Sequence, residues 1–370
     1  MKSWGNERMW NVIGIIFHQR KITLLRKGLE PYEYLPFYTR LARIYGCHLF
    51  FYSWQELLLD RSLKRGYYYN WQEERWQYGA IPIPKVNLFR AKLPSREDRA
   101  RQFLPYQQAS DVQFLNLPWE MNKATIYTVL AANPRLQPYL PWTQPLTLSN
   151  LQAGLNQYGR LLVKPIFGSK GAGIRLIEQR DQGVWQAYRT RTKRGVPPTL
   201  RWSPIRDLTD WIISIGRKER FLIQHFLSLR RYADSPLDLR ISVQKGREEN
   251  WAITGSVLRV AAAQDFVTNV ARGGKVLAFS TIAPRLTTEQ MEQLEWLAYE
   301  VAQTIEEWSP RVMDLGLDLA LDEEGKLWFI EANFCDQRYA YREVGDIATW
   351  YTTYAYPIGY AYSKLEEYIK

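Results

Sequence analysis

The chain has 370 residues, enough for two or three domains; its 46% hydrophobic content excludes a disordered protein, and its apolar runs fall far short of the ~20 residues that span a bilayer. The 49 Lys and Arg residues outnumber the 38 Asp and Glu residues, but they are spread along the chain, which favours general surface charge or an enzyme of polyphosphates over a nucleic-acid binder. Two cysteines and three histidines do not suffice for a disulfide framework or a histidine- and cysteine-rich zinc site, so we expect a cytoplasmic protein in which oxygen holds any metal.

The first third predicts a small α/β unit. Apolar runs at residues 11–17 and 48–52 are typical of strands, and the helical spacing of large apolar side chains predicts a helix over residues 31–45 between them. Strand, helix and strand in that order imply a parallel sheet. No phosphate-binding turn occurs here, so we expect this unit to be a scaffold beside a cleft.

We expect a domain boundary near residues 110–120, after which the predicted secondary structure changes. A helix is predicted at 123–132, and a connector with four prolines follows it up to residue 147. Short strands then dominate between residues 161 and 260. A helix at 287–308, with a buried apolar stripe, leads into a predicted hairpin at 315–334.

A glycine-rich turn joins two predicted strands in the segment LLVKPIFGSKGAGI, residues 161–174. Its glycines allow backbone N–H groups to converge on an anion, and Lys164 just before it supplies a positive charge. The spacing is neither that of a Walker loop nor that of a dinucleotide fingerprint. Taken alone, the pattern is also that of an ordinary hairpin turn.

The hairpin near the end places acidic residues among apolar ones. Opposed residues of a hairpin have a constant sum of residue numbers, so Asp318 should lie across from Glu331, with Asn333 on the same face as Glu331. Two opposed carboxylates repel unless a cation lies between them, and oxygen ligands of this kind select Mg²⁺. The alternative is an exposed acidic face of an amphipathic hairpin.

Between these two segments lies a third group of polar residues. Asp238 and Arg240 alternate onto one face of a predicted strand, where the aspartate could orient the arginine. Arg259 follows, and the segment from Phe266 to Gly274 (FVTNVARGG) resembles a loop whose donors point at an anion.

The order of these patterns resembles the ATP-grasp superfamily over about residues 115–340. The stretch from Asp238 to Gly274 looks most like the glutamate-ligase branch that modifies ribosomal protein. The N-terminal third, the tryptophan-rich segment at residues 71–76 and the sequence NVARGG at 269–274 are together similar to the spore-coat-associated YheC/YheD group of spore-forming bacteria.

The resemblance implies a role for each matching residue. The lysines near the nucleotide phosphates are Lys123 and Lys164. The flap over the phosphates contains Gly168, Ser169, Lys170, Gly171 and Gly173. A hinge whose backbone contacts adenine comprises Gln224, His225 and Phe226. The Mg²⁺ ligands are Asp318, Glu331 and Asn333, and the residues near the transferred phosphoryl group are Arg240, Asn269 and Arg272.

One segment departs from the family pattern. Carboxylate ligases of this kind commonly continue from the asparagine into a small residue followed by Pro-Gly, whereas Phe334 to Arg338 (FCDQR) follows here. The departure puts the acceptor substrate in doubt but leaves the nucleotide site intact.

The fold implied is α/β: a Rossmann-like N-terminal domain at residues 1–115, followed by a two-lobed α+β ATP-grasp domain at 116–370. The implied activity is an ATP- and Mg²⁺-dependent ligation of a carboxylate to an amine through an acyl phosphate, with small molecules or peptides as substrates. A non-catalytic ATP-binding coat or scaffold protein and a phosphotransferase are the alternatives, and spore-coat proteins are the partners that the YheC/YheD resemblance suggests. A nucleic-acid-binding module is favoured least, because no basic stripe coincides with stacking aromatic residues.

Overall fold

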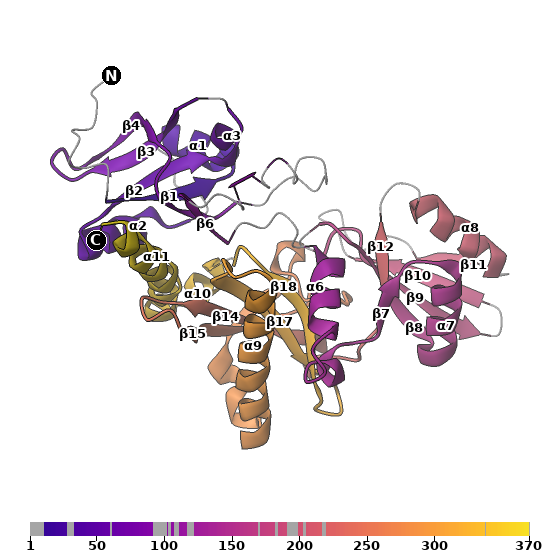
Figure 1. The fold of residues 1–370 in the computed structure, drawn as a ribbon. Coiled ribbons are helices and arrows are strands. Elements are labelled where there is room, and N and C mark those ends of the chain that lie inside the picture. The colour runs from indigo at the N-terminus through magenta and orange to yellow at the C-terminus, as the bar shows by residue number, and fades with distance from the viewer. Residues whose placement is uncertain are drawn as a thin grey trace.

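The computed structural model describes residues 11–27, 33–59, 61–91, 102, 105–106, 111–116, 122–168, 171–181, 184–190, 199–202, 205–216, 220–336 and 338–369. They form three β-sheets with helices packed against them (Figure 1). The first sheet has the strand order β4-β3-β2-β1-β5-β6, the second β11-β10-β9-β8-β12-β7, and the third β16-β15-β14-β17-β18, with β13 paired to β14. Among these residues no helix is both long and apolar enough to cross a membrane.

The first sheet is mixed. Its strands are β1 (Val12–Phe17), β2 (His48–Ser53), β3 (Leu63–Asn70), β4 (Arg75–Pro82), β5 (Val86–Phe89) and β6 (Gln113–Leu115), accompanied by helices α1 (Gln19–Arg26), α2 (Leu35–Tyr45) and α3 (Trp54–Leu57). Strand β1 pairs in parallel with β2 and β5, and β5 pairs in parallel with β6, which confirms the predicted parallel unit. The β3–β4 hairpin extends the sheet in the antiparallel sense beyond β2, which the sequence did not predict.

The second sheet is antiparallel and carries the glycine-rich turn. Helix α6 (Lys123–Ala131) and the 3₁₀ turn η2 (Gln137–Tyr139) lead into it, and its elements are β7 (Thr143–Pro145), α7 (Leu148–Tyr158), β8 (Arg160–Pro165), β9 (Arg175–Asp181), β10 (Val184–Arg189), β11 (Leu200–Trp202), α8 (Ile205–Gly216) and β12 (Phe221–His225). The predicted extended connector therefore contains a short edge strand that pairs with β12.

The third sheet is also antiparallel and holds the largest core. Its elements are β13 (Arg231–Tyr232), β14 (Ser235–Lys245), β15 (Trp251–Val260), η3 (Val270–Arg272), β16 (Lys275–Ala278), η4 (Phe279–Thr281), η5 (Ala283–Arg285), α9 (Thr288–Trp308), β17 (Asp314–Leu321) and β18 (Leu327–Asn333). Helix α9 begins at a capping box formed by Thr287 and Gln290, and it buries Leu294, Val301 and Ile305 as the periodicity predicts.

The C-terminal helices join the third sheet to the first. Helix α10 (Tyr339–Glu343) is short, whereas α11 (Ile347–Ile369) packs against α2 and against β1, β5, β14 and β15 (Figure 1). The Tyr354 hydroxyl accepts a hydrogen bond of 3.0 Å from the backbone N–H of Tyr34. The domain division after residue 115 stays a prediction, and the end of the chain packs on the N-terminal sheet.

Candidate functional site

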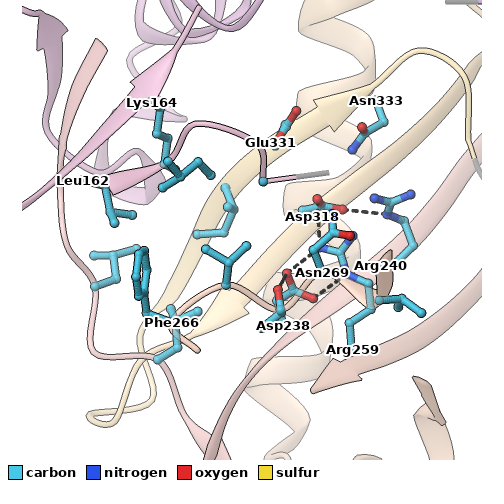
Figure 2. A pocket seen from close by; sticks show the side chains of 18 of the residues that line it. Leu162, Lys164, Asp238, Arg240, Arg259, Phe266, Asn269, Asp318, Glu331 and Asn333 are labelled. Atoms are coloured by element: carbon cyan, nitrogen blue, oxygen red, sulfur yellow. Dashed lines mark hydrogen bonds and ion pairs between the residues drawn. The ribbon is translucent and has the colours of Figure 1, made fainter. Parts of the chain in front are cut away.

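A cleft lies between the second and third sheets. Residues of β8 and β12 line one side, and residues of β14, β15, β17, β18 and the segment 266–270 line the other (Figure 2). Counted out to the open solvent at its mouth, it contains about 1220 Å³ of empty space. No described residue before Leu162 lines this cleft.

The cleft has an apolar part and a charged part. Leu162 and Phe266 lie together on one side, and Arg240 and Asn333 lie on the other, with Lys164 and Glu331 at the upper edge (Figure 2). Further apolar lining comes from Ile174, Phe226, Leu227, Leu229 and Ile330. This arrangement suits a ligand that combines a flat apolar ring with a polyanion.

The two predicted phosphate-binding lysines approach the same edge of the cleft from different elements. Lys123, the first residue of α6, places Nζ 3.5 Å from Oε1 of Glu331 and donates a hydrogen bond of 3.0 Å to the carbonyl of Gly168. Lys164, at the end of β8, donates to the side-chain oxygen of Gln224. Burial lowers the pKa of Lys164 to about 8, although Glu331 opposes this shift. Lys164 is therefore poised to gain an anionic partner.

The predicted hinge, residues 224–226, lies at the end of β12 and lines the cleft. The His225 ring stacks on Tyr158 with ring centroids 4.2 Å apart, and burial lowers the pKa of His225. The backbone N–H of His225 donates to Trp142, and that of Phe226 donates to Arg160. These two amides are therefore engaged within the second sheet. The backbone groups of the hinge that could hydrogen-bond to a nucleotide base are its carbonyls and the N–H of the residue after Phe226.

The glycine-rich turn connects β8 and β9, which pair as the predicted antiparallel hairpin. Gly168, Gly171 and Gly173 all have positive φ angles, 122°, 64° and 78°, which favour glycine. A Cβ on Gly171 would lie 3.1 Å from both Arg272 and Val267, so the turn touches the 266–272 segment across the cleft. Ser169 and Lys170, predicted at its tip, lie outside the described residues.

The hairpin of β17 and β18 pairs Asp318 with Glu331, as the residue sum predicted. The register shifts beside this pair, because Leu319 lies opposite Phe329 and leaves Ile330 as a bulge. The positive charge that the sequence required beside these carboxylates is supplied by arginines of the protein. The Nε of Arg240 lies 2.6 Å from Oδ1 of Asp318, and a terminal nitrogen of Arg259 lies 2.8 Å from Oδ2. Burial opposes ionisation, but these two guanidinium groups outweigh it and hold the pKa of Asp318 below its usual value.

The three predicted metal ligands, Asp318, Glu331 and Asn333, all line the cleft. Among the described residues no group of three His, Cys, Asp or Glu side chains is placed to hold a metal ion. Oxygens of Glu331 and Asn333 and the remaining lone pairs of Asp318 form a hard-oxygen donor set that fits Mg²⁺. Because the Asp318 charge is already matched by arginines, this set fits an ion that also has phosphate oxygens as ligands.

The arginines are oriented differently from the prediction. Asp238 binds Arg259, which lies opposite it on β15, and also accepts a hydrogen bond from Thr268. Arg240 is held instead by Asp318 and by Asp336, whose Oδ1 lies 3.1 Å from its terminal nitrogen. The proposal that Asp238 orients Arg240 is therefore wrong, because neighbours across the sheet, and not along the strand, provide the partners.

The remaining predicted residues lie on the segment between β15 and β16. Asn269 lines the cleft, whereas Arg272 lies in η3 beside the glycine-rich turn. Sequence reasoning assigned no site role to Thr268, Asp336 or Tyr339, although the first and last line the cleft. The turn at residues 246–250 alone does not predict the Asp238–Arg259 pair, because the register shifts by one residue between Ser242 and Val243.

Two antiparallel sheets that enclose such a cleft, with a mixed sheet before them, define the ATP-grasp fold. The structure is similar to the crystal structure of D-cycloserine synthetase DcsG, with a TM-score of 0.55 and 11% identity over 96% of this chain and 99% of that chain. It is also similar to the D-alanine–D-alanine ligase from Coxiella burnetii, with a TM-score of 0.51 and 11% identity over 96% of each chain. At this identity the likeness concerns the fold.

The family follows from the sequence comparison. The YheC/D-like ATP-grasp family model matches residues 111–363, and the chain belongs to that family. A curated relative is the endospore coat-associated protein YheD of Bacillus subtilis (strain 168), 23% identical over 301 residues, or 78% of this chain. The chain spans 63% of the length of that relative.

Proposed function

We propose that the chain is an ATP- and Mg²⁺-dependent ligase that joins a carboxylate to an amine. The observation that carries the proposal is the cleft itself. An apolar slot adjoins a wall that presents Lys164, Arg240 and the oxygens of Asp318, Glu331 and Asn333. Membership of the ATP-grasp family supports this assignment.

In this proposal the nucleotide base lies in the apolar slot between Leu162 and Phe266. The phosphates extend toward Lys123 and Lys164, and the glycine-rich turn covers them with its backbone N–H groups. Phosphate charge would favour the protonated form of Lys164, whose pKa burial lowers to about 8.

Mg²⁺ would be held by Glu331 and Asn333, with Asp318 as the third ligand. When bound, the ion neutralises phosphate charge and orients the phosphates. Arg240 and Arg259 keep Asp318 ionised in place. The metal and the nucleotide are then expected to bind together, each increasing the affinity for the other by the same factor.

The reaction requires no protein nucleophile. An oxygen of the substrate carboxylate attacks the γ-phosphorus of ATP, the bond to the β-phosphate oxygen breaks, and ADP leaves. The amine nitrogen then attacks the acyl carbon, the C–N bond forms, and phosphate leaves as a proton is lost from nitrogen to solvent. Arg240, Asn269 and Arg272 are assigned to the side of the cleft where the phosphoryl group is transferred, so that fixed donors stabilise the developing charge.

The test is a screen for ADP release with amino acids and short peptides as carboxylates and amines. A ligase releases ADP only when both substrates are present, and the product contains a new amide bond by mass spectrometry. ADP release with a hydroxyl acceptor and a phosphorylated product would instead identify a phosphotransferase. In each assay the Glu331→Gln variant is the control for metal-dependent turnover.

A second candidate is a non-catalytic ATP-binding protein of the spore coat. The name of the YheD relative, endospore coat-associated protein, favours it, as does the matching of the Asp318 charge by arginines. This candidate predicts ATP binding without ADP release under any substrate pair. It also predicts that the protein is found with coat proteins, whereas the ligase proposal places it in the cytoplasm.

A further inference from the structure

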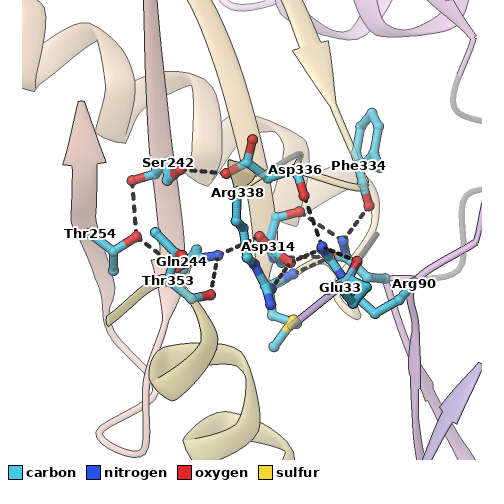
Figure 3. A network of polar contacts seen from close by, with 12 residues as sticks. Glu33, Arg90, Ser242, Gln244, Thr254, Asp314, Phe334, Asp336, Arg338 and Thr353 are labelled. Carbon is cyan, nitrogen blue, oxygen red and sulfur yellow. Dashed lines mark hydrogen bonds and ion pairs between the residues drawn. The ribbon is translucent and has the colours of Figure 1, made fainter. Parts of the chain in front are cut away.

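The segment that departs from the family pattern is residues 334–338, and its described residues do not line the cleft. The described side chains of Phe334, Asp336 and Arg338 are buried, with 7%, 1% and 2% of their surface exposed. Figure 3 shows them within a polar network that also contains Glu33 and Arg90 of the N-terminal unit. The segment therefore connects the N-terminal unit to the third sheet.

Both oxygens of the Asp336 carboxylate have partners on β14. Oδ1 accepts a hydrogen bond of 3.1 Å from Arg240, and Oδ2 accepts one from the hydroxyl of Ser242. A Cβ on Gly316, opposite Ser242 on β17, would lie 2.4 Å from Oδ1. The carboxylate is thus pressed against the sheet at a place that only glycine leaves open.

The backbone of this segment is fixed by residues from distant parts of the chain. The carbonyl of Asp336 accepts a hydrogen bond of 2.8 Å from Arg90, and Arg90 also contacts Glu33 at 2.9 Å and Asp314 at 2.7 Å. The carbonyl of Phe334 accepts one of 2.7 Å from Asn116. Asp336 consequently has little freedom to move without the N-terminal unit.

This arrangement determines where Arg240 points. Its Nε binds Asp318 at 2.6 Å and one terminal nitrogen binds Asp336, so two edges of the planar guanidinium are held. Among the described residues no acceptor is recorded for its other terminal nitrogen, and Arg240 lines the cleft (Figure 2). A guanidinium held on two edges presents its third edge in one direction.

We propose that Asp336 is a positioning residue that holds Arg240 in the orientation in which it contacts the transferred phosphoryl group. The inference rests on the proposed ligase function. It assigns a role to the segment that replaces the small residue and Pro-Gly of related ligases. Through Arg90, the N-terminal unit fixes an arginine of the cleft that its own described residues do not line.

Two variants of Asp336 weaken its interaction with Arg240 to different degrees. In Asp336→Asn the amide oxygen still accepts from Arg240 while its NH₂ group donates to Ser242, so mainly the charge is lost. Asp336→Ala removes both contacts. The matched control is Thr254→Val, which deletes a buried hydroxyl of the same network. That hydroxyl donates to the backbone carbonyl of Ser242 and to the side-chain oxygen of Gln244, and it contacts neither Asp336 nor Arg240.

Turnover and ATP affinity are measured for the wild type and all three variants. We expect turnover to fall about threefold to tenfold in Asp336→Asn and about 10- to 100-fold in Asp336→Ala, with the Kd of ATP·Mg²⁺ within about threefold of the wild type. Thr254→Val should keep wild-type turnover. Unchanged turnover in Asp336→Ala, or an equal loss in Thr254→Val, would overturn the proposal.

A second readout needs neither substrate nor catalysis. The exchange of the Arg240 Nε proton with water is followed by NMR, with the resonance assigned from its loss in Arg240→Lys. We expect exchange at least about tenfold faster in Asp336→Ala and unchanged in Thr254→Val. If Asp336→Ala leaves the exchange rate unchanged, the positioning role is wrong. If exchange accelerates but the wild type never consumes ATP, the positioning role stands and the ligase function falls.

Discussion

The second and third sheets meet at the same cleft but are stabilised in different ways. The second sheet encloses a small apolar core around Leu161, Ile177 and Ile223, and one ion pair among its described residues, Arg160 with Glu178 at 3.1 Å, is exposed on the arginine side. The third sheet has a larger apolar core and also buries charged side chains in its strands, among them Asp238, Arg240, Arg259, Asp314 and Asp318.

The difference separates two tasks. Charges that must point in fixed directions lie on the sheet in which several partners hold each side chain. The glycine-rich turn and Lys164 lie on the second sheet, and a turn with three glycines has few side chains to anchor it, so local opening costs less. We infer that the second sheet and its turn move over the nucleotide, while the third sheet and the first remain together through α11 and the network around Arg90.

The largest expected effect concerns the two carboxylates of the predicted metal site. Asp318→Asn leaves Arg240 and Arg259 buried without their shared anion and should lower the free energy of unfolding by about 3 kcal/mol. Glu331→Gln removes only a 3.5 Å contact to Lys123 on a side chain that is 32% exposed, so its cost should stay below about 1 kcal/mol. Urea unfolding without metal or nucleotide measures both.

The same two variants test the metal site. Both should lose the increase in ATP affinity that Mg²⁺ provides, measured by calorimetry with and without the ion. Unchanged magnesium dependence in both variants would contradict the assignment. Equal unfolding free energies would contradict the view that arginines, and not a metal ion, relieve the charge of Asp318.

A second prediction concerns Arg272, which reaches the glycine-rich turn from the third sheet. If it stabilises the transferred phosphoryl group, Arg272→Ala should lower turnover about 10²- to 10³-fold and change the Kd of ATP by only a few-fold. Arg240→Ala should behave alike in turnover but also unfold more easily, because Asp318 and Asp336 lose a buried partner. A collapse of ATP affinity in Arg272→Ala would place this residue in the nucleotide site instead.

Sequence patterns predicted what depends on local order and missed what depends on lateral packing. The buried stripe of α9 follows from spacing alone, and spacing also predicted the pair of Asp318 and Glu331, although it did not show the bulge at Ile330. That Arg240 meets Asp318 requires β14 to lie beside β17, which no local pattern states. Helix α11 was missed because its six tyrosines and an internal Pro357 weaken every helical signal, and packing on α2 and the first sheet stabilises it.

The lysine of the second sheet gives a pH dependence. Because burial lowers the pKa of Lys164 to about 8, its charge is present below pH 8 and is lost above it. ATP affinity should therefore be constant at lower pH and fall by up to about tenfold per pH unit above pH 8. Lys164→Arg keeps its charge throughout and should remove this step, which calorimetric titration between pH 6 and about 9.5 would show. A step that persists in Lys164→Arg belongs to another group.

The smallest expected effect concerns the closing of the glycine-rich turn. Gly171 has a φ of 64°, and an added Cβ would lie 3.1 Å from Arg272 and Val267, which belong to the other side of the cleft. Gly171→Ala should therefore cost about 1 kcal/mol through backbone strain, and it should additionally weaken the contact between the turn and the third sheet. Gly168→Ala is the matched control, because its φ of 122° is also positive but its Cβ would meet nothing within 4 Å.

Amide hydrogen exchange of residues 165–174 measures this difference. In the wild type these amides should exchange quickly without ligand and slowly with ATP and Mg²⁺, because the turn closes over the phosphates. Gly171→Ala should keep the fast exchange without ligand and lose part of the slowing by nucleotide. Gly168→Ala, whose added Cβ strains the backbone but meets no neighbouring atom, should keep the slowing. If nucleotide leaves the exchange of the wild type unchanged, the turn is an ordinary hairpin. If both variants lose the slowing equally, backbone strain, and not contact across the cleft, governs closure of the turn. The contact of Gly171 with the third sheet would then not support the view that the second sheet moves while the third sheet positions the charged groups.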